Sequence, residues 1–444
     1  MVQDVNATIE SAKKSRKLPM AIAAVVAIGM SGIFLFPNPS PEQAMANYAE
    51  QYIELALALD TLHQGEVDIY FGPEALDERD EPTNKNLDEL ILEGQQLRVR
   101  ITELELEQSS SRQARLQEKI TALIAVMESL QESASLAYAE QANSLFGIDL
   151  GDIESIDVSP FRDELEALLP GSGAIAYRLA QFRNQYIVPA DKREAVVARA
   201  LEECKARAQA HWSFPENEQL TVQWTQDIAE PWHEFQGHAQ SLLRLNPMGM
   251  GYLSSAIDVA CHEGYVGHHA QYVFIEQANA PLLPEDTLVL LRSPESSLRE
   301  ATANYAVDLV FPMAERIQFE QEVLAPIAGL QRLDFEKYNR VRELLNEISL
   351  ATVAILRDYN DRTIPQASAT FRLEREALVS SPNQLLAFSD RFGAYAAAYT
   401  IGRVRVADYI ERRVQETGLS PWQVLKTIIE ENQTAVLNFN KAQS

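Results

Sequence analysis

Residues 262–269 read His-Glu-Gly-Tyr-Val-Gly-His-His and contain three of the seven histidines in this 444-residue chain. Two further histidines, His233 and His238, lie in the preceding segment, so five of the seven fall between positions 233 and 269. Neutral imidazoles bind Zn²⁺, and a glutamate beside the first histidine ligand can act as a general base. The octapeptide therefore indicates a zinc-dependent hydrolase.

The spacing of these histidines requires a break in the helix that carries them. In the common H-E-x-x-H motif, two histidines four positions apart lie about 40° apart around a helix and face one ion. Here Val266 stands at that position, and His268 lies about 120° from His262 on a regular helix. Gly264 and Gly267 are where the helix could turn. Without such a turn, the cluster would instead be a helical surface that serves a subunit or loop contact.

The composition excludes several other classes of protein. A net charge of −26 argues against nucleic acid and against anionic lipid as partners of the folded part. The chain has only two cysteines, Cys204 and Cys261, so it cannot contain a framework of several disulfides or a C-x-x-C motif. One disulfide bond between them is possible. The length allows two or three domains. Because no Pro/Gly/Ser-rich linker and no repeat interrupts the chain, we expect one large domain.

The N-terminal segment differs from the rest of the chain. Four basic residues between 13 and 17 precede an apolar run over 18–36. A run of this length can span a bilayer, and the basic residues keep the side that carries them in the cytoplasm. We therefore expect a cytoplasmic tail over 1–17, a transmembrane anchor over 18–36 and a linker over 37–45.

Residues 46–444 would then form a helical metallopeptidase-like domain in the periplasm or the extracellular space. The alternative is a cleaved signal peptide, because Ala44-Met-Ala46 resembles a cleavage site. A lipid anchor is not expected, since no cysteine follows the apolar run.

Apolar residues recur at helical spacing over most of the chain from residue 42 on. The pattern predicts an all-α protein with at most a small sheet, and Leu220–Trp224 is its best strand candidate. Two long helices, 86–107 and 111–145, are expected to form a hairpin that packs and scaffolds. The other predicted helices cover 42–63, 160–169, 174–186, 190–212, 232–244, 251–277, 297–310, 333–358, 366–377, 391–415 and 420–437.

The octapeptide resembles the HE-x-Y-P-G-HH signature of a bacterial family known as domain of unknown function 885, which is related to the helical zinc peptidases of gluzincin type. Four further segments resemble elements of that family, in the same order along the chain. These are Tyr52–Leu59 with Asp68–Pro73, Phe235–Asn246, Glu300–Ala306 and Tyr399–Gly402. The resemblance implies a gluzincin-like helical domain that hydrolyses peptides with zinc as its cofactor.

The resemblance also assigns roles to residues. It implies His262, His268 and Glu300 as metal ligands and Glu263 as the base that activates water. It further implies that Tyr399 and Arg403 stabilise the oxyanion of the tetrahedral intermediate. The residues that we expect to contact the substrate lie within the matching elements and are Asn246, His269 and Tyr305.

Some positions depart from the family pattern or compete for a role. Val266 replaces the proline of the signature, and Ala301, Thr302 and Thr400 replace residues of the later elements. None of these changes removes a proposed ligand or the base. Glu295 is the competing third ligand, although Pro294 beside it favours a place in the first turn of a helix.

Other residues near the octapeptide are read as structural. His233 and His238, five apart on a predicted helix, diverge by about 140°, so His233 is interpreted as structural, whereas His238 could line the cleft. Cys261 is interpreted as buried rather than nucleophilic. The main alternative to an enzyme is a membrane-anchored scaffold or pseudoenzyme that binds partners through the long hairpin.

Overall fold

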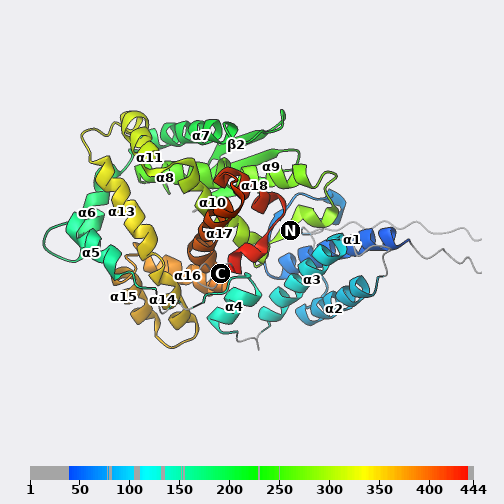
Figure 1. The fold of residues 1–444 in the computed structure, drawn as a ribbon. Coiled ribbons are helices and arrows are strands. Elements are labelled where there is room, and N and C mark those ends of the chain that lie inside the picture. The colour runs from blue at the N-terminus through cyan, green and yellow to red at the C-terminus, as the bar shows by residue number, and fades with distance from the viewer. Residues whose placement is uncertain are drawn as a thin grey trace, which may run out of the picture. The chain divides into compact units, whose positions relative to one another are not determined.

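Helices form most of the structure, in agreement with the predicted fold class (Figure 1). The computed structural model describes residues 40–438, apart from 78, 80–82, 105–110, 132–135, 152, 154–155, 229–230 and 250. The predicted transmembrane segment therefore lies outside the described residues. Among the helices that are described, none is long and apolar enough to cross a membrane. A compact unit begins at Pro41, where the first helix starts, so residues 41–45 belong to this helix.

The described part of the first half of the chain contains seven α-helices. The predicted hairpin is present as α2 and α3, which pack against each other and against α1. The predicted helix 111–145 ends early and is followed by the separate helix α4. The bounds are α1 (Pro41–Leu62), α2 (Leu87–Glu103), α3 (Ser111–Ser129), α4 (Tyr138–Ser144), α5 (Ser159–Leu168), α6 (Ile175–Arg183) and α7 (Arg193–Gln209).

The second half contains the other eleven described helices. Two of them, α13 and α14, replace the one predicted over 333–358, and the pattern missed α11, α12 and α16. The bounds are α8 (Leu253–Val259), α9 (His268–Ala278), α10 (Pro294–Val310), α11 (Met313–Phe319), α12 (Ala325–Ala328), α13 (Phe335–Ile348), α14 (Ala351–Asn360), α15 (Gln366–Arg375), α16 (Pro382–Phe392), α17 (Arg403–Thr417) and α18 (Pro421–Glu430).

Side chains at the helix ends explain several of these starts. Asn86 and Glu89 form a reciprocal capping box at the start of α2, and Ser420 and Gln423 form another at the start of α18. Each box satisfies backbone N–H groups that have no partner inside the helix.

Helix α10 lies at the centre of the molecule and carries Glu300 (Figure 1). It contacts α17, α18 and α9, and also the two segments that bear the other candidate site residues. Ala301, Ala303 and Ala306 on this helix are fully buried. Small side chains allow neighbouring backbones to approach closely, so several elements can meet around Glu300.

Two small sheets accompany the helices. Strands β1 (Val67–Tyr70) and β5 (Leu288–Leu290) pair antiparallel, whereas β2 (Gln219–Trp224) lies parallel to β4 (Gln240–Leu245), which pairs antiparallel with β3 (Trp232–Phe235). Strand β2 confirms the one predicted strand.

The predicted helix over 232–244 is wrong, because this segment is the hairpin of β3 and β4. Gly237, His238 and Ala239 all have positive φ angles, which an α-helix excludes. The Glu276 carboxylate accepts hydrogen bonds from the backbone N–H groups of His238 at 2.7 Å and Ala239 at 2.8 Å. A contact from a helix distant in sequence therefore stabilises the turn. This contact cannot be predicted from the sequence pattern of the turn itself. Along β4, buried and more exposed side chains alternate, as in a half-buried strand.

The predicted helix over 251–277 is broken inside the octapeptide, as the histidine spacing required. Helix α8 continues into a π-helical turn at Ala260–Gly264, the chain leaves the helix at Tyr265–Gly267, and α9 begins at His268. The Gly267 N–H donates to the carbonyl oxygen of Cys261 at 2.9 Å, which closes the bend. The turn forms with Val266, fully buried, in place of proline.

Gly267 is the position at which a side chain would disrupt this bend. An added Cβ would lie 1.6 Å from the carbonyl oxygen of His262. We expect Gly267→Ala to lower the free energy of unfolding by about 3 kcal/mol or more, at the upper end of overpacking effects. Gly251→Ala is the control, since its Cβ would meet no atom within 4 Å, and a change within about 0.5 kcal/mol is expected. Urea unfolding of both variants measures the difference, and similar values would contradict this explanation of the bend.

Candidate metal centre

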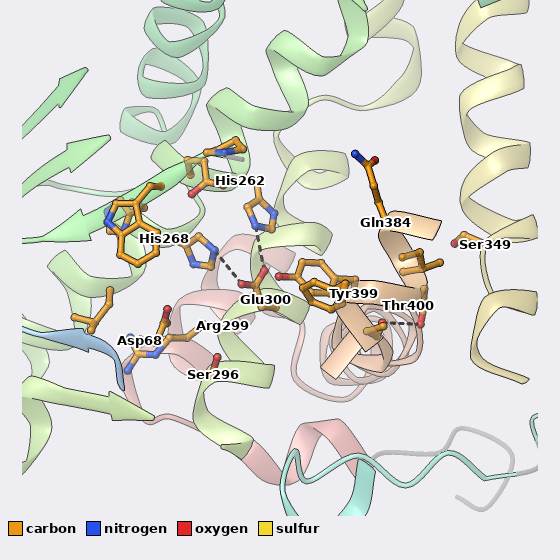
Figure 2. Close-up of a pocket in the computed structure, with 18 of the residues that line it drawn as sticks. Asp68, His262, His268, Ser296, Arg299, Glu300, Ser349, Gln384, Tyr399 and Thr400 are labelled. Carbon is orange, nitrogen blue, oxygen red and sulfur yellow. Dashed lines mark hydrogen bonds and ion pairs between the residues drawn. The ribbon is translucent and has the colours of Figure 1, made fainter. Parts of the chain in front are cut away.

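Three side chains of the predicted site meet at one point. His262 Nε2 lies 3.2 Å from Glu300 Oε2, and His268 Nε2 lies 3.6 Å from Glu300 Oε1. The two imidazole rings are perpendicular, with centroids 4.7 Å apart. One candidate ligand atom from each residue lies within 4.8 Å of those of the other two. Figure 2 shows both rings directed at the Glu300 carboxylate.

The bend explains how two histidines six positions apart reach the same carboxylate. His262 belongs to the π-helical turn, and His268 is the first residue of α9. The π-turn and the break at Tyr265–Gly267 change the direction of the chain between the two rings. The Tyr265 hydroxyl donates a hydrogen bond to the buried carboxylate of Glu218, which fixes this segment from outside the site.

The donor set fits a divalent metal such as zinc. Two imidazoles and one carboxylate are the protein ligands of many catalytic zinc sites, which keep a fourth position open. Glu300 Oε2 is buried and accepts no well-aligned hydrogen bond, although His262 Nε2 is near. A buried carboxylate oxygen without a hydrogen bond is costly unless a cation faces it.

The electrostatics of the cluster agree with this interpretation. Burial alone would lower the pKa of His268, but the charge of Glu300 beside it raises that pKa to about 9. Burial also acts to raise the pKa of Glu300, yet the two histidines hold it far below its usual range. In both cases the site favours positive charge beside the carboxylate.

Glu295, the competing third ligand, points elsewhere. Its carboxylate lies 2.8 Å from Lys119 Nζ and also pairs with Arg299. Burial tends to raise its pKa, but these two cations lower it to about 2. The N-cap of α10 is Ser293, whose side chain accepts from the N–H of Ser296. Glu295 is therefore a buried ion-pair partner one turn before Glu300.

A disulfide bond joins Cys204 on α7 to Cys261, the residue before His262, with a Cα–Cα distance of 5.6 Å. Both cysteines are fully buried. The one disulfide bond that the sequence allows is thus present in the structure. Cys261 is therefore not a free thiol that could act as a nucleophile. The bond ties the π-helical turn of the site to a neighbouring helix.

The three residues border a main cavity of about 720 Å³. Its walls come from β1, β3, α9, α10, α14, α16 and the segment around Tyr399. Polar side chains gather around Glu300 (Figure 2), and the lining of the cavity also includes apolar side chains. The apolar lining side chains include Ile69, Trp232, Leu385 and Phe388.

A second cavity of about 300 Å³ opens on the other side of the same centre. The two cavities share four lining residues: His262, Glu263, Ser349 and Tyr399. The candidate metal centre thus stands where two arms of one cleft meet.

The predicted catalytic residues line this cleft. Glu263 follows His262 in the π-helical turn and borders both arms. Tyr399 lies in another π-helical turn, Ala398–Gly402, and its hydroxyl points toward Glu300 (Figure 2). Burial, the charge of Glu300 and a hydrogen bond to it raise the pKa of Tyr399 well above its usual value. Arg403 borders only the second arm.

The three residues expected to contact substrate do not border either arm. His269 is fully buried, and its ring bridges Ser241 at 2.8 Å and Glu218 at 3.0 Å. The Asn246 side chain donates to a backbone carbonyl at 2.6 Å and so braces a loop. Tyr305 packs against the hydrophobic core. Each lies beside a true site element in sequence, but helix and strand geometry turn its side chain away.

Three cavity residues were not identified from the sequence. His233, interpreted as structural on a helix, borders the main arm from β3 and contacts Ser241 at 3.0 Å. Asp68 on β1 and Arg299 on α10 also border this arm. Burial and the charge of Glu300 raise the pKa of Asp68 to about 6. A strand prediction for 232–235 would have placed His233 correctly. Asp68 begins a segment that resembles the family, but that resemblance assigned no role to it.

No protein-family profile and no curated protein matches this chain. The chain is similar to the solved structure of "a putative lipoprotein of unknown function from Shewanella oneidensis", with 12% identity, a TM-score of 0.50 and coverage of 81% of this chain and 73% of that one. It is also similar to "the putative lipoprotein from Colwellia psychrerythraea", with 14% identity and a TM-score of 0.49. That match covers 80% of this chain and 66% of the Colwellia chain. The likeness to the Shewanella structure shows that this fold also occurs in a protein that is very distant in sequence.

Proposed function

We propose that this protein is a zinc-dependent hydrolase that cleaves peptides outside the cytoplasm. The observation that carries the proposal is the meeting of His262, His268 and Glu300, with a buried carboxylate oxygen that lacks a hydrogen bond. The adjacent glutamate and tyrosine border the same cleft. The resemblance to the domain of unknown function 885 and to gluzincin-type peptidases supports the same reaction class.

The residues around the centre have distinct roles in this proposal. Zinc held by the three ligands would lower the pKa of a bound water to about 7 and polarise the scissile carbonyl. Glu263 would take the proton from the attacking water and pass it to the leaving amine. The Tyr399 hydroxyl would donate a hydrogen bond to the oxyanion. Its raised pKa keeps it protonated, as a donor must be.

Two observations support a location outside the cytoplasm. The disulfide between Cys204 and Cys261 is of a kind that persists in oxidising compartments. The similar solved structure from Shewanella oneidensis is described as a putative lipoprotein. In this chain the apolar run over 18–36 would serve as the anchor, with residues 1–17 in the cytoplasm.

Metal content tests the proposal against a non-catalytic scaffold. We expect the full-length protein, purified in detergent, to contain one zinc per chain by elemental analysis. It should also cleave a mixture of unmodified peptides, and removal of zinc by a strong chelator should stop cleavage until zinc is restored. A folded protein without stoichiometric metal, and without cleavage after zinc is added, would instead support the scaffold.

A further inference from the structure

The second arm of the cleft contains two arginines whose hydrogen-bonding capacity is largely unused. Arg342 on α13 and Arg403 at the start of α17 both border this arm, together with His262 and Glu263 of the centre. Their side chains are only 14% and 19% exposed. Each guanidinium carries five N–H donors in a planar fork. Such groups, largely removed from water, normally have close partners.

The acidic neighbours of these arginines are held at long distances. Arg403 lies 3.7 Å from Asp308 and 3.6 Å from Glu347, and its guanidinium makes no hydrogen bond to any part of the chain that the structure describes. Arg342 reaches a single oxygen of Asp308, at 3.3 and 3.4 Å, and its buried Nε has no partner. Charge-assisted hydrogen bonds are normally 2.7–2.9 Å long. The acidic neighbours therefore hold Arg403 only through long ion pairs and Arg342 only through long hydrogen bonds to one oxygen.

We propose that Arg342 and Arg403 bind the C-terminal carboxylate of a peptide that lies across the metal centre. A carboxylate offers two oxygens that match the guanidinium fork. Asp308 and Glu347, which are 41% and 39% exposed, can turn toward water when the substrate carboxylate enters. This inference rests on the proposed function and deepens it: the substrate is a peptide with a free carboxyl terminus.

The dimensions of the arm limit how far the cut lies from that terminus. Asp308 follows Glu300 by eight residues on α10, which places it about 12 Å further along the helix axis. An extended peptide covers that distance with three to four residues at about 3.3–3.6 Å each. Because both arginines border the same arm as His262 and Glu263, cleavage is expected within about three residues of the C-terminus. The larger, mostly apolar main arm would hold the remainder of the peptide.

The test uses random-sequence hexapeptides prepared with free C-terminal carboxylates and, separately, with C-terminal amides. Full-length protein loaded with zinc is incubated with each mixture, and mass spectrometry locates the cuts. We expect cuts within three residues of the C-terminus and cleavage at least about tenfold slower for the amides. Equal cleavage of both mixtures, or cuts set by distance from the N-terminus, would overturn the inference while leaving the hydrolase proposal intact.

Three variants connect the preference to the arginines. Arg342→Gln and Arg403→Gln are each expected to reduce the acid-over-amide preference at least tenfold. If one of the two variants fails to fold, the other still tests the inference. Arg340→Gln is the matched control, because Arg340 lies on the same helix, is 43% exposed and pairs with Glu164. It should keep the full preference. Retention of the preference in both folded test variants would refute the role of the arginines.

A binding measurement separates this inference from the proposed function. The same two mixtures are passed over immobilised protein, and the retained peptides are compared. Enrichment of free acids over amides by wild type and Arg340→Gln, but not by Arg342→Gln, supports the carboxylate site even if no peptide is cleaved. Equal retention of acids and amides by the wild type would overturn the inference, whatever the outcome of the hydrolysis assay.

Discussion

Replacement of Glu263 by glutamine is expected to leave zinc bound and the fold intact while slowing peptide hydrolysis about 10²–10⁴-fold. That range is the usual contribution of a positioned general base. Glu263 borders both arms of the cleft, next to the ligand His262, but does not belong to the ligand set. Glutamine preserves the size of the side chain and removes its capacity to take a proton. The loss should therefore appear in kcat, with little change in metal content.

The measurement combines turnover on cleaved peptides with zinc content and thermal unfolding of the same preparation. Glu322→Gln serves as the control for a change of charge, because this residue is exposed on the surface. It should keep wild-type turnover. A Glu263→Gln variant with full turnover would refute the role of Glu263 as base, whereas a variant without zinc would indicate that Glu263 is a ligand.

The sequence predicted a mainly helical fold because helical periodicity is a local pattern, whereas the role of His262, His268 and Glu300 as metal ligands stays a prediction. Helical periodicity and capping residues reported α1, α2 and α7 within a few residues of their ends. The six-residue spacing of His262 and His268 required a broken helix, and the structure bends at Gly267 as that argument demanded. The resemblance to a known family supplied Glu300, which no spacing rule could have selected over Glu295.

What the sequence did not predict depends on contacts between distant segments. The strands β3 and β4 were read as a helix because Glu276, far along the chain, holds their turn. As a result His233 was interpreted as structural, whereas it borders the main cavity. The contact residues chosen near the ligands in sequence, such as His269, face the opposite way and support the fold. Proximity in sequence to a ligand thus proved a poor guide to the side chains that line the cleft.

Replacement of Glu300 and of Glu295 is expected to separate metal binding from stability. Glu300→Ala removes one of three ligands, so zinc affinity should fall by more than the roughly 10–100-fold that outer-shell substitutions cost. Glu295→Ala should keep zinc but leave Lys119 and Arg299 as buried charges without their carboxylate. Breaking a buried ion pair in this way costs about 3–5 kcal/mol, more than the roughly 1 kcal/mol expected for a helix cap.

The two effects are measured on the same samples, as zinc retained after dialysis against a weak chelator and as the free energy of unfolding in urea. Glu300→Gln is the companion variant, since it keeps the size of the side chain and loses the charge that faces the two histidines. If Glu295→Ala released as much zinc as Glu300→Ala, the assignment of the third ligand would be overturned. Loss of zinc from Glu300→Ala with the fold retained, together with a less stable but zinc-containing Glu295→Ala, would establish that α10 carries a ligand at 300 and an ion-pair partner five residues earlier.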